Sequence, residues 1–186
     1  ISMKRWASGI GVSIACCATG LFAGNGGWAV DGDGVWTNGA NWAGGAVAGG
    51  FGSTAYFTNT LTARRTVTVD QPVTVEALRF SSPAFNNWRL IGDGPITLDG
   101  YSKPRLGSSV NQRVEIFTPL AGTNGFIQEL LYGDIELAGV NTGLTGIVEL
   151  KANSIYQTLS KSAESTDALV RNYFPTGGVI MGGARL

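Results

Sequence analysis

The chain has 186 residues with 13 Lys or Arg and 13 Asp or Glu, so its formal net charge is zero. This balance excludes a strong electrostatic attraction to nucleic acid or to an anionic membrane surface. Histidine is absent, which removes the commonest general base and the commonest transition-metal ligand. The 28 glycines, well above the average of about 7%, favour tight turns between short strands.

A hydrophobic leader is predicted at residues 1–29. Met3-Lys4-Arg5 is a short positive start, and the uncharged stretch after it is rich in small and apolar side chains, which is typical of a secretory signal peptide. Cleavage is expected after Ala23 or after Ala29, and the second site is preferred because Asp31 then lies at the start of the mature chain. The alternative is a retained N-terminal membrane anchor.

Short strands are predicted over residues 30–154, a β-rich repeat domain. In Thr66-Val-Thr-Val-Asp70 every second residue is Val, and Val73-Thr-Val75 continues the alternation that a half-buried strand requires. Turn dipeptides such as Asp99-Gly100 separate these segments. The other predicted strands are Leu78–Phe80, Trp88–Ile91, Ile96–Leu98, Val114–Phe117, Phe126–Tyr132, Asp134–Leu137 and Ile147–Leu150.

The last part of the chain, residues 155–186, is less regular. Residues 155–172 are the only stretch with a loose helical periodicity of apolar side chains, so a partly helical segment is predicted there. We expect this part to cap the β-rich domain, or to be an incomplete segment of a longer chain.

Strands about ten residues apart fit a parallel β-solenoid or an antiparallel β-sandwich. Turns of varying length with recurrent asparagines favour the solenoid, in which apolar side chains stack on their equivalents in adjacent coils. We therefore predict an all-β fold, with the solenoid first and the sandwich as the alternative, behind an N-terminal hydrophobic leader helix. The turn asparagines are Asn41, Asn59, Asn86, Asn111, Asn124, Asn141 and Asn153.

Four motifs resemble the opening of large bacterial surface proteins that carry autotransporter-associated β-strand repeats. Leu120–Gly146 is similar to one such repeat unit, although Gln128–Gly133 stands where the family has Lys-x-Gly-x-Gly. The likeness covers roughly residues 30–153 and implies a passenger-like part of an exported protein. The four motifs are Trp36–Trp42, Ala55–Asn59, Thr66–Asp70 and Leu78–Phe80.

Two acid pairs are candidate chemical sites. Asp31-Gly-Asp33 places two carboxylates where they could bind calcium, and a plain polar turn is the preferred alternative. Asp93 and Asp99 flank a predicted strand and could form the acid/base pair of a glycosidase, with ordinary Asp-Gly turns preferred. We therefore assign no catalytic, cofactor-binding or metal-binding residue, and no cofactor.

The aromatic and basic residues also have a binding interpretation and a structural one. Tryptophans at positions 28, 36, 42 and 88 could stack on sugar rings, but capping the end of a sheet or core is preferred. Arg64-Arg65 and Lys103-Pro-Arg105 are expected to be isolated basic pairs in solvated loops.

These observations predict a non-enzymatic, secreted or cell-surface bacterial protein with a structural or adhesive role. Its expected partners are copies of itself or neighbouring surface proteins and polysaccharides, and a membrane only if the leader is retained. One alternative is a carbohydrate-binding or carbohydrate-cleaving β-helix module, which should place two carboxylates, or a Lys or Arg with an acid, on one coil face. The other is an accessory subunit of a membrane complex, anchored on the periplasmic side by an uncleaved leader.

Overall fold

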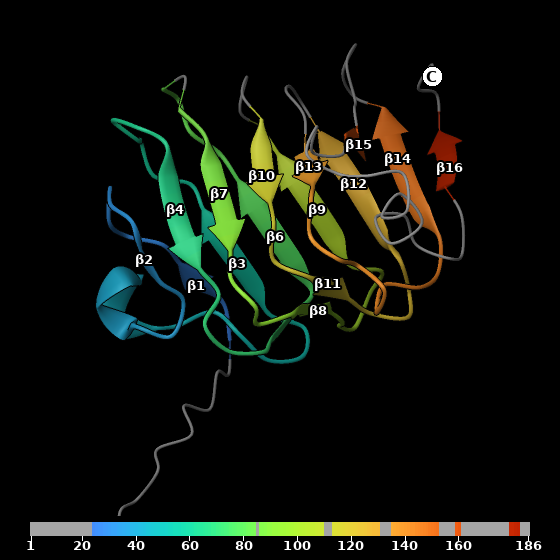
Figure 1. The fold of residues 1–186 in the computed structure, drawn as a ribbon, viewed down its shortest axis with the longest axis horizontal. Helices are drawn as coiled ribbons and strands as arrows, with labels where there is room; N and C mark the ends of the chain where they lie inside the picture. Colours follow the sequence, from blue (N-terminus) through green and yellow to red (C-terminus); the bar gives the residue numbers. More distant parts are fainter. Residues whose placement is uncertain are drawn as a thin grey trace, which may run out of the picture.

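The fold is a parallel β-solenoid, as Figure 1 shows. The computed structural model describes residues 24–84, 86–109, 113–130, 135–152, 159–160 and 179–182. Every pairing between named strands in these residues is parallel, which confirms the predicted solenoid and excludes the antiparallel sandwich. Of the leader predicted at residues 1–29, residues 1–23 lie outside the described residues, whereas Gly26–Gly27 form a strand of the first coil.

Three sheets form the sides of the solenoid, and successive coils visit sheet I, sheet II and sheet III in turn. Sheet I contains β1 (Gly26–Gly27), β3 (Thr54–Phe57), β6 (Ala77–Phe80), β9 (Arg105–Ser108), β12 (Phe126–Leu130), β14 (Val148–Ala152) and β16 (Val179–Gly182). Sheet II contains β2 (Gly34–Val35), β4 (Arg65–Thr68), β7 (Trp88–Ile91), β10 (Val114–Ile116), β13 (Ile135–Leu137) and β15 (Leu159–Ser160). Sheet III contains β5 (Val73–Val75), β8 (Ile96–Leu98) and β11 (Leu120–Ala121).

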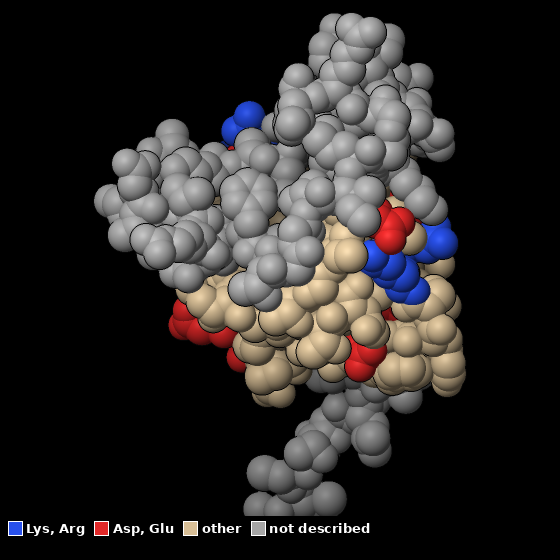
Figure 2. Space-filling model, turned by 90° about the vertical axis from the view of Figure 1, so that its right-hand side faces the viewer, with Lys and Arg blue, Asp and Glu red and all other residues tan. Residues whose placement is uncertain are grey.

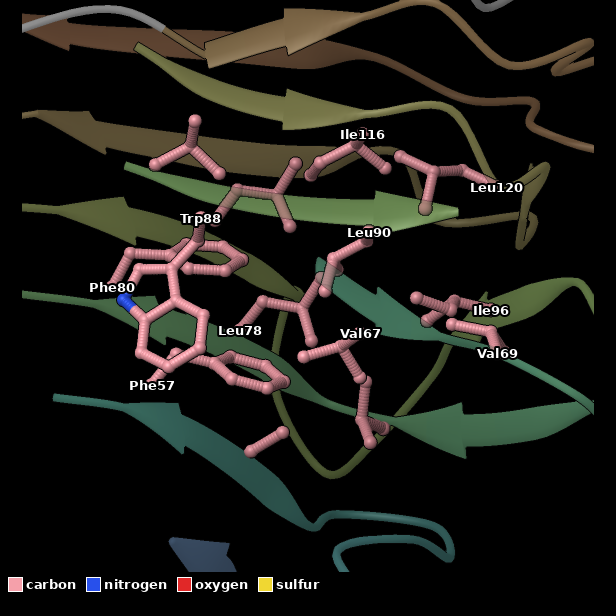
Figure 3. Packing of buried hydrophobic residues seen from close by; sticks show 14 of the residues in the cluster. Phe57, Val67, Val69, Leu78, Phe80, Trp88, Leu90, Ile96, Ile116 and Leu120 are labelled. Atoms are coloured by element: carbon pink, nitrogen blue, oxygen red, sulfur yellow. The ribbon is translucent and has the colours of Figure 1, made fainter. Parts of the chain in front are cut away.

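Apolar ladders along the solenoid axis form the core. In sheet II, Val67 pairs with Leu90, Leu90 with Ile116, and Ile116 with Leu137, and all four side chains are buried. Figure 3 shows the first three pointing into the same interior. Burial of each such side chain contributes about 1.5–3 kcal/mol relative to exposure. The period-two alternation of the sequence thus becomes a continuous inner row.

Three of the predicted turn asparagines join neighbouring coils. Asn59 Nδ2 donates to the carbonyl oxygen of Val30 at 2.9 Å, and Asn86 Nδ2 donates to that of Leu61 at 2.8 Å. Asn141 Oδ1 accepts a hydrogen bond from the backbone N–H of Leu120 at 2.7 Å. Each bond joins residues more than 20 positions apart, so it reports coil stacking rather than local turn geometry. Asn111 and Asn153 lie outside the described residues.

Strand boundaries depart from the sequence predictions in several places. β1 lies upstream of the expected domain start at residue 30, because its two glycines carry no alternating signal. β9 and β11 were not predicted, since each offers only a short apolar stretch beside Gly or Pro. Within the stretch predicted to be partly helical, Leu159–Ser160 forms strand β15, and the rest lies outside the described residues.

The chain closes the N-terminal end of its own solenoid with a segment that we call the N-terminal cap, residues 36–49. The cap runs antiparallel to β1, with bridges between Trp28 and Trp42 and between Gly24 and Gly49. Two short 3-10 turns, η1 (Gly39–Asn41) and η2 (Ala43–Gly45), lie within it at the blue end of the ribbon in Figure 1. Unpaired strand edges invite pairing with other chains. The cap occupies this edge of sheet I.

The cap also reaches sheet II. Asn41 Nδ2 donates to the carbonyl oxygen of Val35 in β2 at 2.9 Å, and the backbone N–H of Asn38 donates to the same oxygen at 3.2 Å. One segment therefore satisfies backbone groups at the ends of both sheets.

Among the helices of the described residues, none is both long and apolar enough to span a bilayer.

Candidate functional site

The Asp31-Gly-Asp33 motif connects the first coil to the next one. Asp31 accepts hydrogen bonds from Arg65 Nε at 2.7 Å and from Thr62 Oγ1 at 2.7 Å, and Asp33 accepts one from the backbone N–H of Thr66 at 2.7 Å. The Arg65 guanidinium, followed by Thr62, lowers the pKa of Asp31 from 3.8 to about 2. The described residues contain no group of three or more His, Cys, Asp or Glu suited to a metal. This geometry supports the polar-turn interpretation.

Asp93 and Asp99 do not face each other as an acid/base pair. The strand β8 lies between them, so the two carboxylates stand at opposite ends of that strand, at two different corners of the coil. Asp99 Oδ1 instead accepts a hydrogen bond from the backbone N–H of Gly100 at 3.0 Å. Both acids belong to turns, as the preferred interpretation expected.

The four tryptophans with predicted roles are all buried; Trp28, Trp36 and Trp42 lie in the first coil and its cap, whereas Trp88 belongs to the inner strand β7. Trp36 and Trp42 have ring centroids 5.1 Å apart, and Trp28 and Trp42 have centroids 5.2 Å apart. Phe57 contacts all three of these indoles and Trp88, whose centroid lies 5.3 Å away. Their faces are therefore covered by other aromatic rings and are not available to a sugar.

Charged side chains on sheet I pair across coils. Arg79 Nη1 lies 3.0 Å from Glu129 Oε2, and Arg105 binds the other oxygen of the same carboxylate. Arg79 and Glu129 belong to strands two positions apart in the sheet, and Gly107 lies between them. A Cβ at Gly107 would lie only 2.4 Å from Arg79 Nη1. The glycine thus leaves room for the arginine to cross one coil.

Sheet II carries a similar row. Arg89 Nε lies 2.6 Å from Glu115 Oε2, Arg64 Nη1 lies 3.5 Å from the same oxygen, and Arg89 stacks over the Phe117 ring at 5.1 Å. Figure 2 shows blue and red surfaces side by side on one flank. Arg113 also pairs with Glu136 of sheet II, whereas Lys103 pairs with Glu149 of sheet I.

The prediction that the basic pairs are isolated is wrong, although Arg64 and Lys103 do lie outside strands, as expected. Arg65 and Arg105 begin strands β4 and β9, and both form ion pairs with acids of other coils. Arg64 and Lys103 also pair with acids of other coils. Their partners come from coils that are distant in the sequence, so no local charge pattern could have revealed them. Such partly exposed pairs contribute about 0–1 kcal/mol each.

One exposed aromatic pair stands out from these structural contacts. Tyr101 and Phe51 are 86% and 53% exposed, and their rings meet edge to face with centroids 4.8 Å apart. The backbone N–H of Tyr101 donates to Glu76 Oε2 at 2.8 Å, and Ser102 Oγ donates to Glu76 Oε1. We call this group, with Gly52 beneath it, the aromatic corner. The sequence alone does not reveal the aromatic corner, because the two rings come from turns that are 50 residues apart.

The aromatic corner exists because one turn is very short. Only Glu76 separates β5 from β6, so the longer turns of the neighbouring coils meet across it. The backbone N–H of Gly52 donates to the carbonyl oxygen of Asp99 at 3.4 Å, although a whole coil lies between their own coils. Gly100 packs on Glu76 so closely that a Cβ there would lie 2.1 Å from Oε2. The corner is therefore a close-packed part of the fold.

Comparison of the chain with protein-family models, with curated proteins and with solved structures finds no match. The resemblance to surface proteins with autotransporter-associated repeats therefore stays a prediction.

Proposed function

We propose that this protein is an exported, non-enzymatic structural or adhesive protein of the bacterial cell surface or extracellular space. A stack of parallel coils gives an elongated, regular surface, which suits a scaffold that contacts copies of itself or neighbouring surface polymers. The autotransporter-associated resemblance points in the same direction.

One observation carries the non-enzymatic part of the proposal: acidic side chains serve the coil stack. A general acid or base must exchange a proton with a bound substrate. Here the carboxylates accept hydrogen bonds from other coils, and the low pKa of Asp31 is the clearest example. The acids that accept such bonds are Asp31, Asp33, Asp70, Glu76, Glu115, Glu129, Glu136 and Glu149.

If the leader is cleaved during export, the remaining chain must keep the residues that build the first coil. Cleavage after Ala29 would remove β1 and with it Trp28, which packs on Trp42 and Phe57. Cleavage after Ala23 would keep all of these residues and the bridge from Gly24 to the cap. We therefore favour Ala23 over the site preferred from the sequence, and intact mass with N-terminal sequencing should give Gly24 as the first residue.

Surface display is tested with the protein expressed from its own leader in a bacterial host. We expect protease added to intact cells to degrade it, while a cytoplasmic control protein survives. Resistance of the protein in intact cells, with degradation only after lysis, would contradict the proposal. A mature mass that retains Met3 would instead favour the accessory subunit held by an uncleaved leader.

A carbohydrate-cleaving module is the second candidate, because the arrangement expected of an enzyme is present on sheet I. Glu129 and Glu149 lie on one face of the solenoid with Lys103 and Arg105. Incubation with neutral and acidic polysaccharides, followed by an assay for new reducing ends, separates the two candidates. If polysaccharide cleavage is observed and disappears in folded Glu129→Gln, the scaffold proposal would be wrong and the enzyme proposal would take its place.

A further inference from the structure

We propose that the aromatic corner binds one sugar ring of a neutral polysaccharide, with the Tyr101 ring as the stacking surface and Phe51 packed against it edge to face. This inference deepens the proposed function, because it names the class of surface polymer that the protein contacts. It concerns a different part of the molecule from the buried tryptophans, which were the aromatic candidates in the sequence.

Tyr101 is exposed yet held in place. Its backbone is fixed by the hydrogen bond to Glu76, and its ring is fixed by the edge-to-face contact with Phe51. The ring also lies against Gly52, where a Cβ would be 2.5 Å from Tyr101 Cε2. Gly52 has φ +77°, which L side chains rarely adopt, so both space and backbone favour glycine there. A preorganised aromatic ring loses little conformational freedom on binding.

Hydrogen-bonding groups lie beside the aromatic rings. The apolar C–H face of a pyranose packs on an aromatic face, whose quadrupole is negative, while sugar hydroxyls need hydrogen-bond partners. The Tyr101 hydroxyl and the Ser102 hydroxyl offer such partners, and an ionised carboxylate has about four acceptor sites. Glu76 accepts hydrogen bonds from the Tyr101 backbone and the Ser102 hydroxyl, so it retains acceptor capacity for a ligand hydroxyl.

The charge of the aromatic corner and the size of its exposed ring favour a neutral sugar. Glu76 and Asp99 place negative charge at the corner, and the nearby Lys103 binds Glu149, so an acidic polysaccharide would be repelled. Specific protein interfaces bury about 1,200–2,000 Å². The exposed Tyr101 ring supplies a small part of that area, but its size matches a single hexose ring.

The test uses the purified chain and saturation-transfer difference NMR with cellohexaose, mannohexaose and chitohexaose. We expect saturation of at least one of these neutral oligosaccharides, and an affinity that falls about 10-fold or more in Tyr101→Ala. Tyr101→Phe keeps the ring and should retain most of the binding. Tyr56→Ala is the matched control, because Tyr56 is an exposed tyrosine of sheet I, 39% exposed, outside the corner. Circular dichroism checks that each variant is folded.

Three results would overturn the inference. They are the absence of binding to all three oligosaccharides, equal binding by folded Tyr101→Ala, and stronger binding to polygalacturonate than to the neutral sugars. Self-association that is lost in Tyr101→Ala would also overturn it and assign the corner to a contact between copies. A protein displayed on cells without sugar binding rejects this inference alone, whereas sugar binding by a protein that stays in the cytoplasm rejects the proposed location.

Discussion

The first coil and the coils after it are stabilised in different ways. The first coil has two-residue strands and depends on a cluster of large aromatic rings under the N-terminal cap. Most strands of the later coils have three to five residues, and these coils repeat the same aliphatic and ionic rows. An inner coil buries its apolar face against two neighbours, whereas the first coil has only one. The end of a solenoid therefore needs side chains that the repeat does not supply.

Trp36→Ala should produce the largest effect on this comparison. The Trp36 indole is fully buried, and its Nε1 donates to the carbonyl oxygen of Ala48 in the cap at 2.9 Å. We expect a loss of about 3–5 kcal/mol in the free energy of unfolding, measured by urea denaturation. A loss below about 1 kcal/mol would mean that the cap does not hold the first coil. Tyr56→Ala is the surface control.

Leu90→Ala should have the next largest effect, since it removes a rung from an inner ladder. Leu90 is fully buried between Val67 and Ile116. The cavity should lower the free energy of unfolding by about 2–4 kcal/mol, as measured by the same denaturation. A larger loss than that of Trp36→Ala would reverse the comparison and place the weak point of the solenoid in its middle.

Gly107→Ala tests the ionic row with a smaller change. The new Cβ would displace the Arg79 guanidinium from Glu129, costing about 0.2–1 kcal/mol. Gly27→Ala is the matched control, because Gly27 lies in the same outward row of sheet I with nothing within 4 Å of the added Cβ. We expect the control to gain stability by about 0.5–1 kcal/mol and Gly107→Ala to gain less or to lose. Equal changes would show that the crossing arginine contributes nothing.

Asp31 gives the smallest effect, visible as a dependence on pH. Its folded pKa of about 2 lies below the ordinary 3.8, so its contribution is complete above about pH 4 and disappears as the pH falls through 2. The difference in denaturation midpoint between the wild type and Asp31→Asn should therefore shrink from pH 6 to pH 2. A constant difference over this range would contradict the ionic contact with Arg65. Asp93→Asn, in an exposed turn, serves as the control.

Several elements were predictable because their signal is local. The alternation in Thr66–Asp70 places Val67 inside and its threonine neighbours outside, and β4 has this pattern. Turn asparagines such as Asn59 also have the coil-linking role that their spacing suggested. By contrast, β1 is made of two glycines, and only its pairing with β3 and the cap makes it a strand.

The candidate site was not predictable, because it depends on how coils of different length stack. Period-two alternation sorts side chains into inner and outer sets, so the residues alone indicate a β-rich chain with buried Val, Leu and Ile. Which turns meet depends on register between segments more than 20 residues apart. Arg79 reaches Glu129 across 50 residues, and Tyr101 reaches Phe51 because the turn at Glu76 is short. These contacts come from tertiary stacking, since no local pattern records the register.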